Sequence, residues 1–156
     1  MMRRRQGQRG LTLVELIVAF TILIVLSTMA VPLARYKIRR DKERDLNYAL
    51  REMRTAIDKF KDDMDAGKIG PPKLDSDNYP ESLDQLVEGV KAMGAIDKKI
   101  KYLRRIPKDP MTNGKEWGLR STRDDPKSSA WGGQNVFDVY TKTMDKARDG
   151  TPYSEW

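Results

Sequence analysis

The chain changes character sharply at residue 11. The first ten residues, MMRRRQGQRG, are polar or basic, whereas residues 11–34 are apolar apart from Glu15, a few hydroxyl side chains and Pro32. An apolar helix of about 20 residues is long enough to cross the hydrocarbon core of a bilayer. Because arginines precede this segment and none lie within it, we expect its amino-terminal end in the cytoplasm and the rest of the chain outside.

A second pattern begins beyond residue 35. The sequence there is highly charged, yet apolar residues recur at alternating spacings of four and three: Leu46, Leu50, Met53, Ile57, Phe60 and Met64. This spacing places them on one face of a helix. Because only Pro32 interrupts the two patterns, we predict one long helix from Leu11 to Asp65, bent or loosened at the proline. The glycines and prolines between residues 67 and 72 would end it.

The outer face of this helix has a basic residue four positions from an acidic one at three places. These are Arg54 with Asp58, Lys59 with Asp63, and Lys61 with Asp65. Residues with this spacing are neighbours on a helix surface, so we predict three weak supporting ion pairs.

Shorter elements are predicted in the remainder. A second helix from Pro80 or Glu81 to about Met93 would place Leu83, Leu86, Val87 and Val90 on one face. Beyond residue 96 turn residues are frequent, and Asn113-Gly114 favours a β-hairpin. Candidate strands are Trp117–Leu119 and Asn135–Thr141. The predicted fold is therefore α+β, with the long helix packed against the short helix and a small antiparallel sheet.

Composition excludes several kinds of chemistry. The chain has no cysteine and no histidine, so it has no Cys/His or Ser/His/Asp nucleophile arrangement, no zinc site with histidine ligands and no disulfide. The net charge of +7 would suit an anionic partner. Four of the basic residues lie in the first ten positions, however, and most others are interleaved with acidic ones. We therefore expect a solvated surface of mixed charge and no nucleic-acid partner.

Other side chains have a simple structural interpretation. Trp117, Trp131 and Trp156 could form a stacking platform, but aromatic residues in a small sheet more often belong to the core. The adjacent carboxylates Asp62-Asp63 and Asp124-Asp125 lie in charge-dense stretches, so we expect them at the surface rather than in acid–base catalysis. No catalytic residue is predicted, and the chain is not expected to be an enzyme.

Two interpretations of residues 1–34 need no special family. A secretory signal peptide could end with a cut after Ala30, with Thr28 as the small residue two positions earlier. A permanent signal anchor could instead use Thr12 and Glu15 as a capping box that begins the helix.

A third interpretation takes the string R-G-L-T-L-V-E-L as a whole, and it resembles the type IV pilin and type II secretion pseudopilin family. The resemblance implies that a membrane aspartic peptidase removes a basic leader by cutting between Gly10 and Leu11. It also implies N-methylation of Leu11, with Glu15 as the fifth residue of the mature chain. Pro32 falls where the family often has a helix-bending proline. Leu11 departs from the phenylalanine usual at the first mature position.

The charges near the cut give this interpretation a physical reason. Cleavage would create an ammonium group on Leu11, and the Glu15 carboxylate would be costly alone in lipid. In a helical stack of subunits the ammonium of one chain can meet Glu15 of its neighbour, and such a desolvated pair selects one axial register. Glu15 is therefore predicted to direct assembly.

Two further segments resemble the major pseudopilins of type II secretion. Residues 79–86 are similar to their second helix, and residues 106–110 are similar to the turn before their sheet. The resemblance implies calcium in the carboxy-terminal region, where Asp145 and Asp149 are possible oxygen ligands. Asp149-Gly150 is equally typical of an ordinary turn.

The resemblance implies three parts: a basic leader (1–10), a transmembrane and filament-core helix (11–34), and a periplasmic pilin-like domain (35–156). It implies a subunit that polymerises from the bacterial inner membrane into the pseudopilus of a type II secretion system. Expected partners are identical subunits, minor pseudopilins, a prepilin peptidase and N-methyltransferase, an inner-membrane assembly platform and, before assembly, membrane lipid. The alternatives are a type IV pilin for adhesion, motility or DNA uptake, or a signal-anchored exported binding module.

Overall fold

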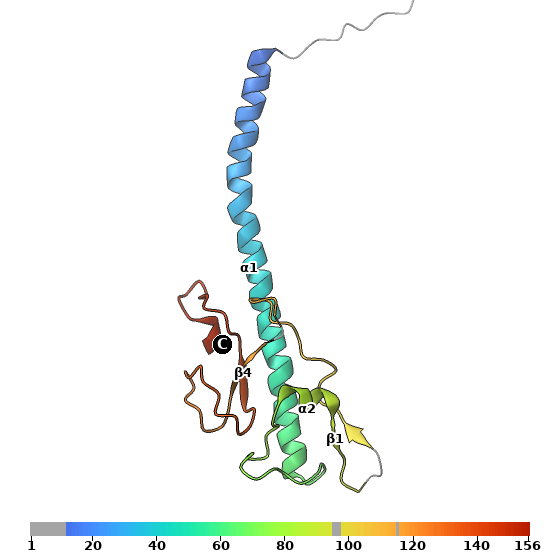
Figure 1. Cartoon of the computed structure of the whole chain (residues 1–156). Helices are drawn as coiled ribbons and strands as arrows, with labels where there is room; N and C mark the ends of the chain where they lie inside the picture. Colours follow the sequence, from blue (N-terminus) through green and yellow to red (C-terminus); the bar gives the residue numbers. More distant parts are fainter. Residues whose placement is uncertain (1–11, 95–97, 115) are drawn as a thin grey trace, which may run out of the picture. The chain divides into compact units, whose positions relative to one another are not determined.

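The computed structural model describes residues 12–94, 98–114 and 116–156. Its elements in chain order are α1 (Leu13–Asp65), α2 (Leu83–Glu88), β1 (Val90–Lys91), β2 (Lys99–Ile100), β3 (Gly118–Arg120), β4 (Asp138–Tyr140) and the 3₁₀ helix η1 (Tyr153–Glu155) (Figure 1). The chain divides into two compact units, Met1–Asp41 and Lys42–Trp156. The predicted α+β fold is confirmed.

The predicted long helix is one continuous element of 53 residues that runs through Pro32. It ends at Asp65, as predicted. Gly67 adopts a φ of 65°, a backbone conformation that residues other than glycine rarely adopt. Two crossed hydrogen bonds complete this end of the helix: Gly67 N–H to Met64 O at 3.0 Å and Lys68 N–H to Asp63 O at 2.9 Å. This pattern is a Schellman motif, which satisfies carbonyl groups that the helix would otherwise leave unpaired.

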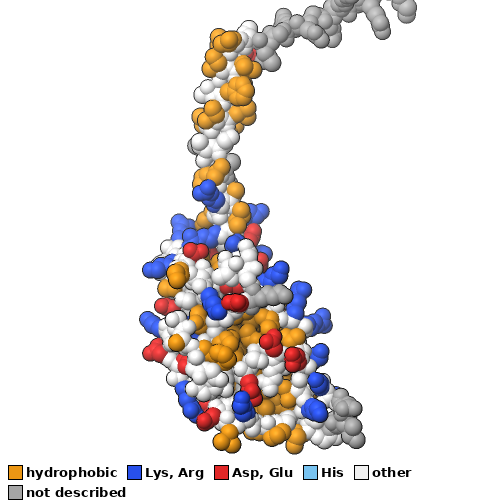
Figure 2. Space-filling model, in the orientation of Figure 1, with side chains coloured by type: hydrophobic (Ala, Val, Ile, Leu, Met, Phe, Trp, Pro, Cys, Tyr) orange, Lys and Arg blue, Asp and Glu red, His pale blue; other side chains and the backbone are white. Residues whose placement is uncertain are grey.

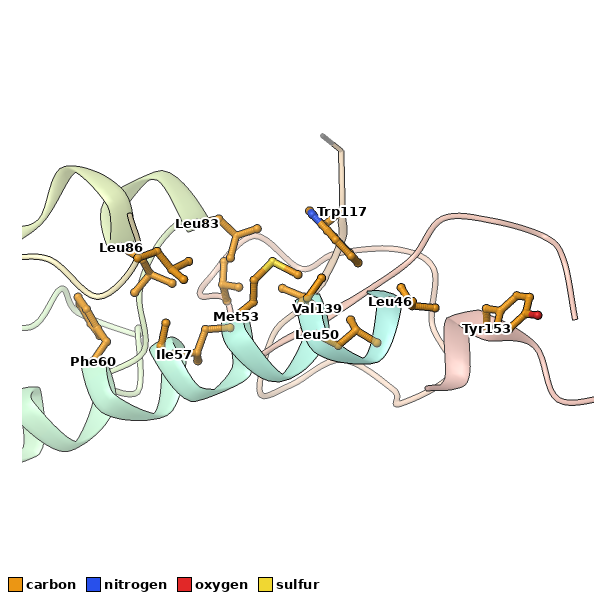
Figure 3. Packing of buried hydrophobic residues seen from close by; sticks show 14 of the residues in the cluster. Leu46, Leu50, Met53, Ile57, Phe60, Leu83, Leu86, Trp117, Val139 and Tyr153 are labelled. Atoms are coloured by element: carbon orange, nitrogen blue, oxygen red, sulfur yellow. The ribbon is translucent and has the colours of Figure 1, made fainter. Parts of the chain in front are cut away.

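The apolar stripe of α1 forms the centre of the core in the second unit. Five of its predicted members are at most 1% exposed: Leu46, Leu50, Met53, Ile57 and Phe60. Met64 is partly buried against them. Figure 3 shows these side chains pointing toward Leu83 and Leu86 of α2, toward Val139 of β4 and toward Trp117. The stripe predicted from spacing alone is therefore confirmed as the surface that the rest of the unit covers.

The second helix is shorter than predicted. Ser82 caps it by accepting a hydrogen bond from Gln85 N–H, but the helix ends at Glu88 rather than near Met93. Gly89 has a φ of 83°, and a Cβ there would come within 2.8 Å of the Ile100 backbone oxygen. This close approach ends the helix and turns the chain into β1, which pairs antiparallel with β2.

The sheet is also smaller and divided. Instead of one sheet there are two separate two-stranded sheets, β1 with β2 and β3 with β4. In the second sheet Gly118 lies opposite Tyr140 and Leu119 lies opposite Val139. A Cβ on Gly118 would come within 2.2 Å of the Tyr140 ring, so the ring packs directly over the glycine backbone.

The Asn113-Gly114 dipeptide forms a turn but not the predicted hairpin. Asn113 has a φ of 56°, and the Gly114 carbonyl accepts a hydrogen bond from Asp109 N–H at 2.8 Å. The Asp109 side chain is fully buried and accepts from Met111 N–H at 2.8 Å and from the Thr141 hydroxyl at 2.5 Å. Two prolines shortly before the turn remove the N–H groups that a strand would need, so the hairpin prediction is wrong.

Only two of the three tryptophans belong to the core. Trp117 is 5% exposed, and its indole N–H donates to the Pro107 carbonyl at 2.9 Å. Trp156 is partly buried and contacts the Tyr153 ring edge to face, with ring centres 4.9 Å apart. Trp131 is 42% exposed, so the prediction that it lies in the core is wrong.

Asp138, at the start of β4, lies between two arginines. Arg54 of α1 donates through Nε to Oδ1 at 2.7 Å and through Nη2 to Oδ2 at 3.3 Å. Arg120 of β3 approaches Oδ2 at 3.6 Å. Arg54 also donates to the backbone oxygens of Val139 and Trp156, at 3.3 and 2.9 Å. One carboxylate therefore ties α1 to both strands of the second sheet.

This network overturns one of the ion pairs predicted along α1. Arg54 pairs with Asp138, 84 residues away, rather than with Asp58 one helical turn away. The bidentate geometry and partial burial favour Asp138 as the partner. Two charge-assisted hydrogen bonds stabilise the fold more than one exposed ion pair would. The Lys61–Asp65 pair is confirmed at 2.7 Å.

The remaining predicted pair, Lys59 with Asp63, is also replaced. Asp63 accepts instead from Lys68 Nζ at 2.9 Å and from the Tyr102 hydroxyl at 3.0 Å. The hydrogen bond from Lys68, and to a lesser extent the one from Tyr102, holds the pKa of the Asp63 carboxyl below its ordinary value. Burial, and to a lesser extent the hydrogen bond to Asp63, raises the pKa of the Tyr102 hydroxyl.

Replacing Arg54 should destabilise the second unit more than replacing an exposed cation. Arg54→Met keeps the length of the side chain but removes every donor to Asp138 and to the backbone oxygens of Val139 and Trp156. We expect a loss of about 1.5–3 kcal/mol in the free energy of unfolding, the range for hydrogen bonds to charged groups. The matched control Lys73→Met breaks the exposed pair with Glu81 and should cost less than about 0.5 kcal/mol. Urea unfolding of the full chain in detergent measures both, and equal losses would contradict the special role of Asp138.

Candidate functional site

The predicted site residues fall in two separate regions. Gly10 and Leu11 lie outside the described residues, so cleavage and methylation there stay predictions. Glu15 and Pro32 lie in the first unit, on α1, whereas Asp145 and Asp149 lie in the second unit, in the segment before η1. The structure describes each region by itself.

Thr12 caps the amino-terminal end of α1. Its hydroxyl oxygen accepts a hydrogen bond from the Glu15 backbone N–H at 3.2 Å, and its carbonyl accepts from Leu16 N–H at 3.1 Å. This is the threonine half of a capping box. In the part of the chain that the structure describes, the Glu15 carboxylate has no hydrogen-bond or ion-pair partner. Capping therefore explains Thr12 and leaves the charge of Glu15 unexplained.

The stretch of α1 that follows is apolar around its whole circumference. From Leu13 to Leu26 its large apolar side chains are between 47% and 74% exposed, and Figure 2 shows them spread along the visible face of this part of the helix. The hydroxyls of Thr21 and Thr28 donate to the carbonyls of Ile17 and Val25, at 2.8 and 2.7 Å. These hydroxyls are thus satisfied within the helix, which suits an apolar environment.

Among the described residues, no helix is both long and apolar enough to cross a membrane. Pro32 lies within α1, and the helix continues on both sides of it. A bend at Pro32 stays a prediction.

Asp145 and Asp149 lie in a tight loop that precedes η1. The Asp149 side chain accepts from Thr151 N–H at 3.0 Å, Ala147 N–H donates to the Thr151 carbonyl at 2.8 Å, and Gly150 has a φ of 89°. The bond from the Thr151 backbone holds the pKa of the Asp149 carboxyl below its ordinary value. Asp149-Gly150 is therefore a turn with its own internal hydrogen bonds.

Calcium takes six to eight oxygen ligands, and this loop offers two carboxylates. Among the described residues there is no group of three or more acidic, histidine or cysteine side chains that could hold a metal ion. Backbone oxygens would have to supply most of the shell, so calcium binding through Asp145 and Asp149 stays a prediction.

Thermal unfolding tests the calcium prediction directly. If calcium binds here, millimolar calcium should raise the unfolding temperature of the chain, and the Asp145→Asn/Asp149→Asn variant should lose that shift. Asp125→Asn is the matched control, because Asp125 also accepts from a backbone N–H two residues on, at 2.8 Å. The prediction fails if the wild type does not respond or if the double variant responds equally.

One surface feature was not predicted from the sequence. An open groove of about 490 Å³ runs between α1 and the segment after β2. Its buried floor includes Ala56 and Leu103, and three of its lining residues are the cations Arg51, Lys59 and Arg104. A sequence signal was present, because residues 98–108 contain six basic residues and no acidic one.

Comparison with known proteins decides the family. Residues 5–31 match the prokaryotic N-terminal methylation motif. The chain is 31% identical over 118 residues to the type II secretion system core protein G of Escherichia coli K12, an alignment that covers 72% of each chain. It is 27% identical over 114 residues to the protein of the same name from Klebsiella michiganensis, over 69% of this chain and 70% of the relative. No solved structure gives a significant match.

The chain belongs to the type II secretion system core protein G family. The resemblance drawn from the string R-G-L-T-L-V-E-L is thereby confirmed. As a member of the core protein G family the chain has a pilin-like role, and the methylation motif covers Gly10, Leu11 and Glu15 together. The motif match also extends past the Thr12 cap, so the features at the start of α1 belong to one matched segment.

Proposed function

We propose that this chain is a structural subunit of the pseudopilus of a type II secretion system. A prepilin peptidase cuts between Gly10 and Leu11, the new amino terminus is N-methylated, and the subunits polymerise through the amino-terminal part of α1. The relatives named core protein G and the methylation motif at residues 5–31 support this proposal. The subunit acts by assembling, and no step requires a catalytic residue.

The observation that carries the proposal is the exposed apolar surface of α1 between Leu13 and Leu26. Full burial of a large apolar side chain lowers the free energy by about 1.5–3 kcal/mol. Eleven such side chains here are 47–74% exposed, so covering the segment with lipid or other helices is strongly favourable. Lipid covers the segment before assembly, and the same segments of identical subunits cover one another in the filament.

The Glu15 carboxylate decides how the helices align. It lies in the apolar segment without a partner among the described residues, and an unpaired charge in such surroundings is costly. The Leu11 ammonium created by cleavage supplies an opposite charge on the neighbouring subunit. Because the pair forms only at one axial offset, it selects the register of the stack.

The proposal places the subunit in the bacterial inner membrane with residues 35–156 in the periplasm. Its partners are identical subunits, minor pseudopilins, the prepilin peptidase and N-methyltransferase, and the inner-membrane assembly platform. A type IV pilin would share the motif, but both relatives carry a secretion-system name, which favours the pseudopilus.

The mature amino terminus tests the processing step. Mass spectrometry of the chain purified from membranes should give a first residue of Leu11, heavier by one methyl group. Substitution of Gly10 by alanine should leave the chain at precursor length. A mature chain that begins at Val31 would instead indicate a cleaved signal peptide and would contradict the proposal.

The role of Glu15 is separated from capping by two variants. Glu15→Gln keeps the size of the side chain and the capped N–H but removes the charge, whereas Thr12→Val removes the cap and keeps the charge. We expect normal cleavage in both and loss of filaments only with Glu15→Gln, because losing a cap costs only about 1 kcal/mol. Electron microscopy of sheared filaments and immunoblotting measure yield and processing.

Filaments at normal yield from Glu15→Gln would show that the carboxylate does not direct assembly. Loss of filaments from Thr12→Val alone would assign the effect to the start of the helix.

A further inference from the structure

The groove beside α1 has the chemistry of a binding surface. Its floor includes Ala56 and Leu103, which are 3% and 4% exposed, and its lining includes the cations Arg51, Lys59 and Arg104. None of these three cations has an ion-pair partner among the described residues. Glu52 is the one acidic residue in the lining. The groove therefore suits a segment with an apolar side chain between carboxylates.

The same chain presents such a segment at another place. Leu74 is 94% exposed, and Asp75 and Asp77 follow it in the loop before α2. Asp75 pairs with Arg123 at 3.0 Å, but both side chains stay more than half exposed. Asp77 accepts from the Thr122 hydroxyl at 2.6 Å and is also exposed. A large apolar side chain is thus displayed beside two accessible carboxylates.

The loop that displays Leu74 is held in shape. Ser76 donates to the Lys73 carbonyl through its backbone N–H at 3.2 Å and through its hydroxyl at 2.9 Å. The Ser76 carbonyl accepts from Tyr79 N–H at 3.0 Å and from the buried amide of Asn135 at 2.9 Å. A fixed loop loses little conformational entropy when it binds, so the exposure of Leu74 favours docking.

We propose that the Leu74 loop of one subunit docks into the groove of a second copy of this chain. Leu74 covers the apolar floor of the groove. Asp75 and Asp77 face the three cations of the groove lining. Because Leu74 is 94% exposed, it does not fill the groove of its own chain. Charge complementarity and an apolar side chain matched to an apolar floor select the second copy as the occupant.

The contact joins two different surfaces, the Leu74 loop of one subunit and the groove of another. Each subunit can therefore bind one neighbour through its loop and a second neighbour through its groove. A contact of this heterologous kind propagates along an open helical assembly instead of closing into a dimer. The inference rests on the proposed filament and names one contact between its globular domains. The contact is small, so it adds to the packing of α1 segments rather than replacing it.

Disulfide cross-linking tests the contact in assembled filaments of the full chain. The natural chain has no cysteine, so every cross-link reports an introduced pair. Leu74→Cys is combined with Thr55→Cys, an exposed residue of the groove lining. The matched control combines Leu74→Cys with Asn47→Cys, which is exposed on α1 and does not line the groove. Both variants and their single-cysteine parents are oxidised with copper phenanthroline and separated without reductant.

We expect a ladder of dimers, trimers and higher oligomers from Leu74→Cys/Thr55→Cys, which reductant collapses, and no ladder from the control or the single variants. Normal filaments without a ladder would overturn this contact and leave the proposed function intact. Dimers alone would indicate a closed contact and would also overturn it, as would a cross-link to a different protein. If the wild type makes no filaments, the proposed function itself fails.

Discussion

The apolar surface of α1 is the constraint on which the rest of this structure depends. The helix is continuous over Leu13–Asp65, but its apolar side chains are covered in only one of its two stretches. Between residues 42 and 65 a narrow stripe is buried by the chain's own α2, strands and loops. Between Leu13 and Leu26 the apolar residues surround the helix and are exposed. The first stretch makes a folded unit, and the second requires other molecules to cover it.

Polar contacts decide how the second unit wraps around its stripe. Burial alone is not directional, so it would allow the strands to lie at several angles to the helix. Asp138 removes this freedom, because Arg54 of α1 and Arg120 of β3 bind the same carboxylate. Asp109 has a similar effect on the turn before β3, where its buried side chain bonds to Thr141. Two carboxylates therefore set directions that the apolar core leaves open.

Periodicity predicted the parts of the fold that depend on local spacing. The α1 stripe, the end of the helix before Gly67 and the buried face of α2 all follow from residues a few positions apart. The wrong predictions depend on distant neighbours. Arg54 pairs with a residue 84 positions away, and α2 stops where Gly89 meets the backbone of Ile100. No local pattern contains those partners.

In the candidate site, too, nearby residues could be predicted from the sequence and contacts between distant residues could not. The methylation motif marked Gly10, Leu11 and Glu15, and the cap formed by Thr12 followed from the same few residues. The groove lined by Arg51 and Arg104 joins segments about fifty residues apart, so spacing could not predict it. The basic run at residues 98–108 showed only that charge would accumulate there.

The cap at Thr12 has a consequence for the order of events in the cell. The hydrogen bond that starts α1 uses only the hydroxyl of Thr12 and the backbone of Glu15, both on the carboxy-terminal side of the predicted cut. Precursor and mature subunit can therefore share the same first turn. The proposed cut would then change the charge next to a helix that already exists, so its proposed role is to allow assembly and not to fold the helix.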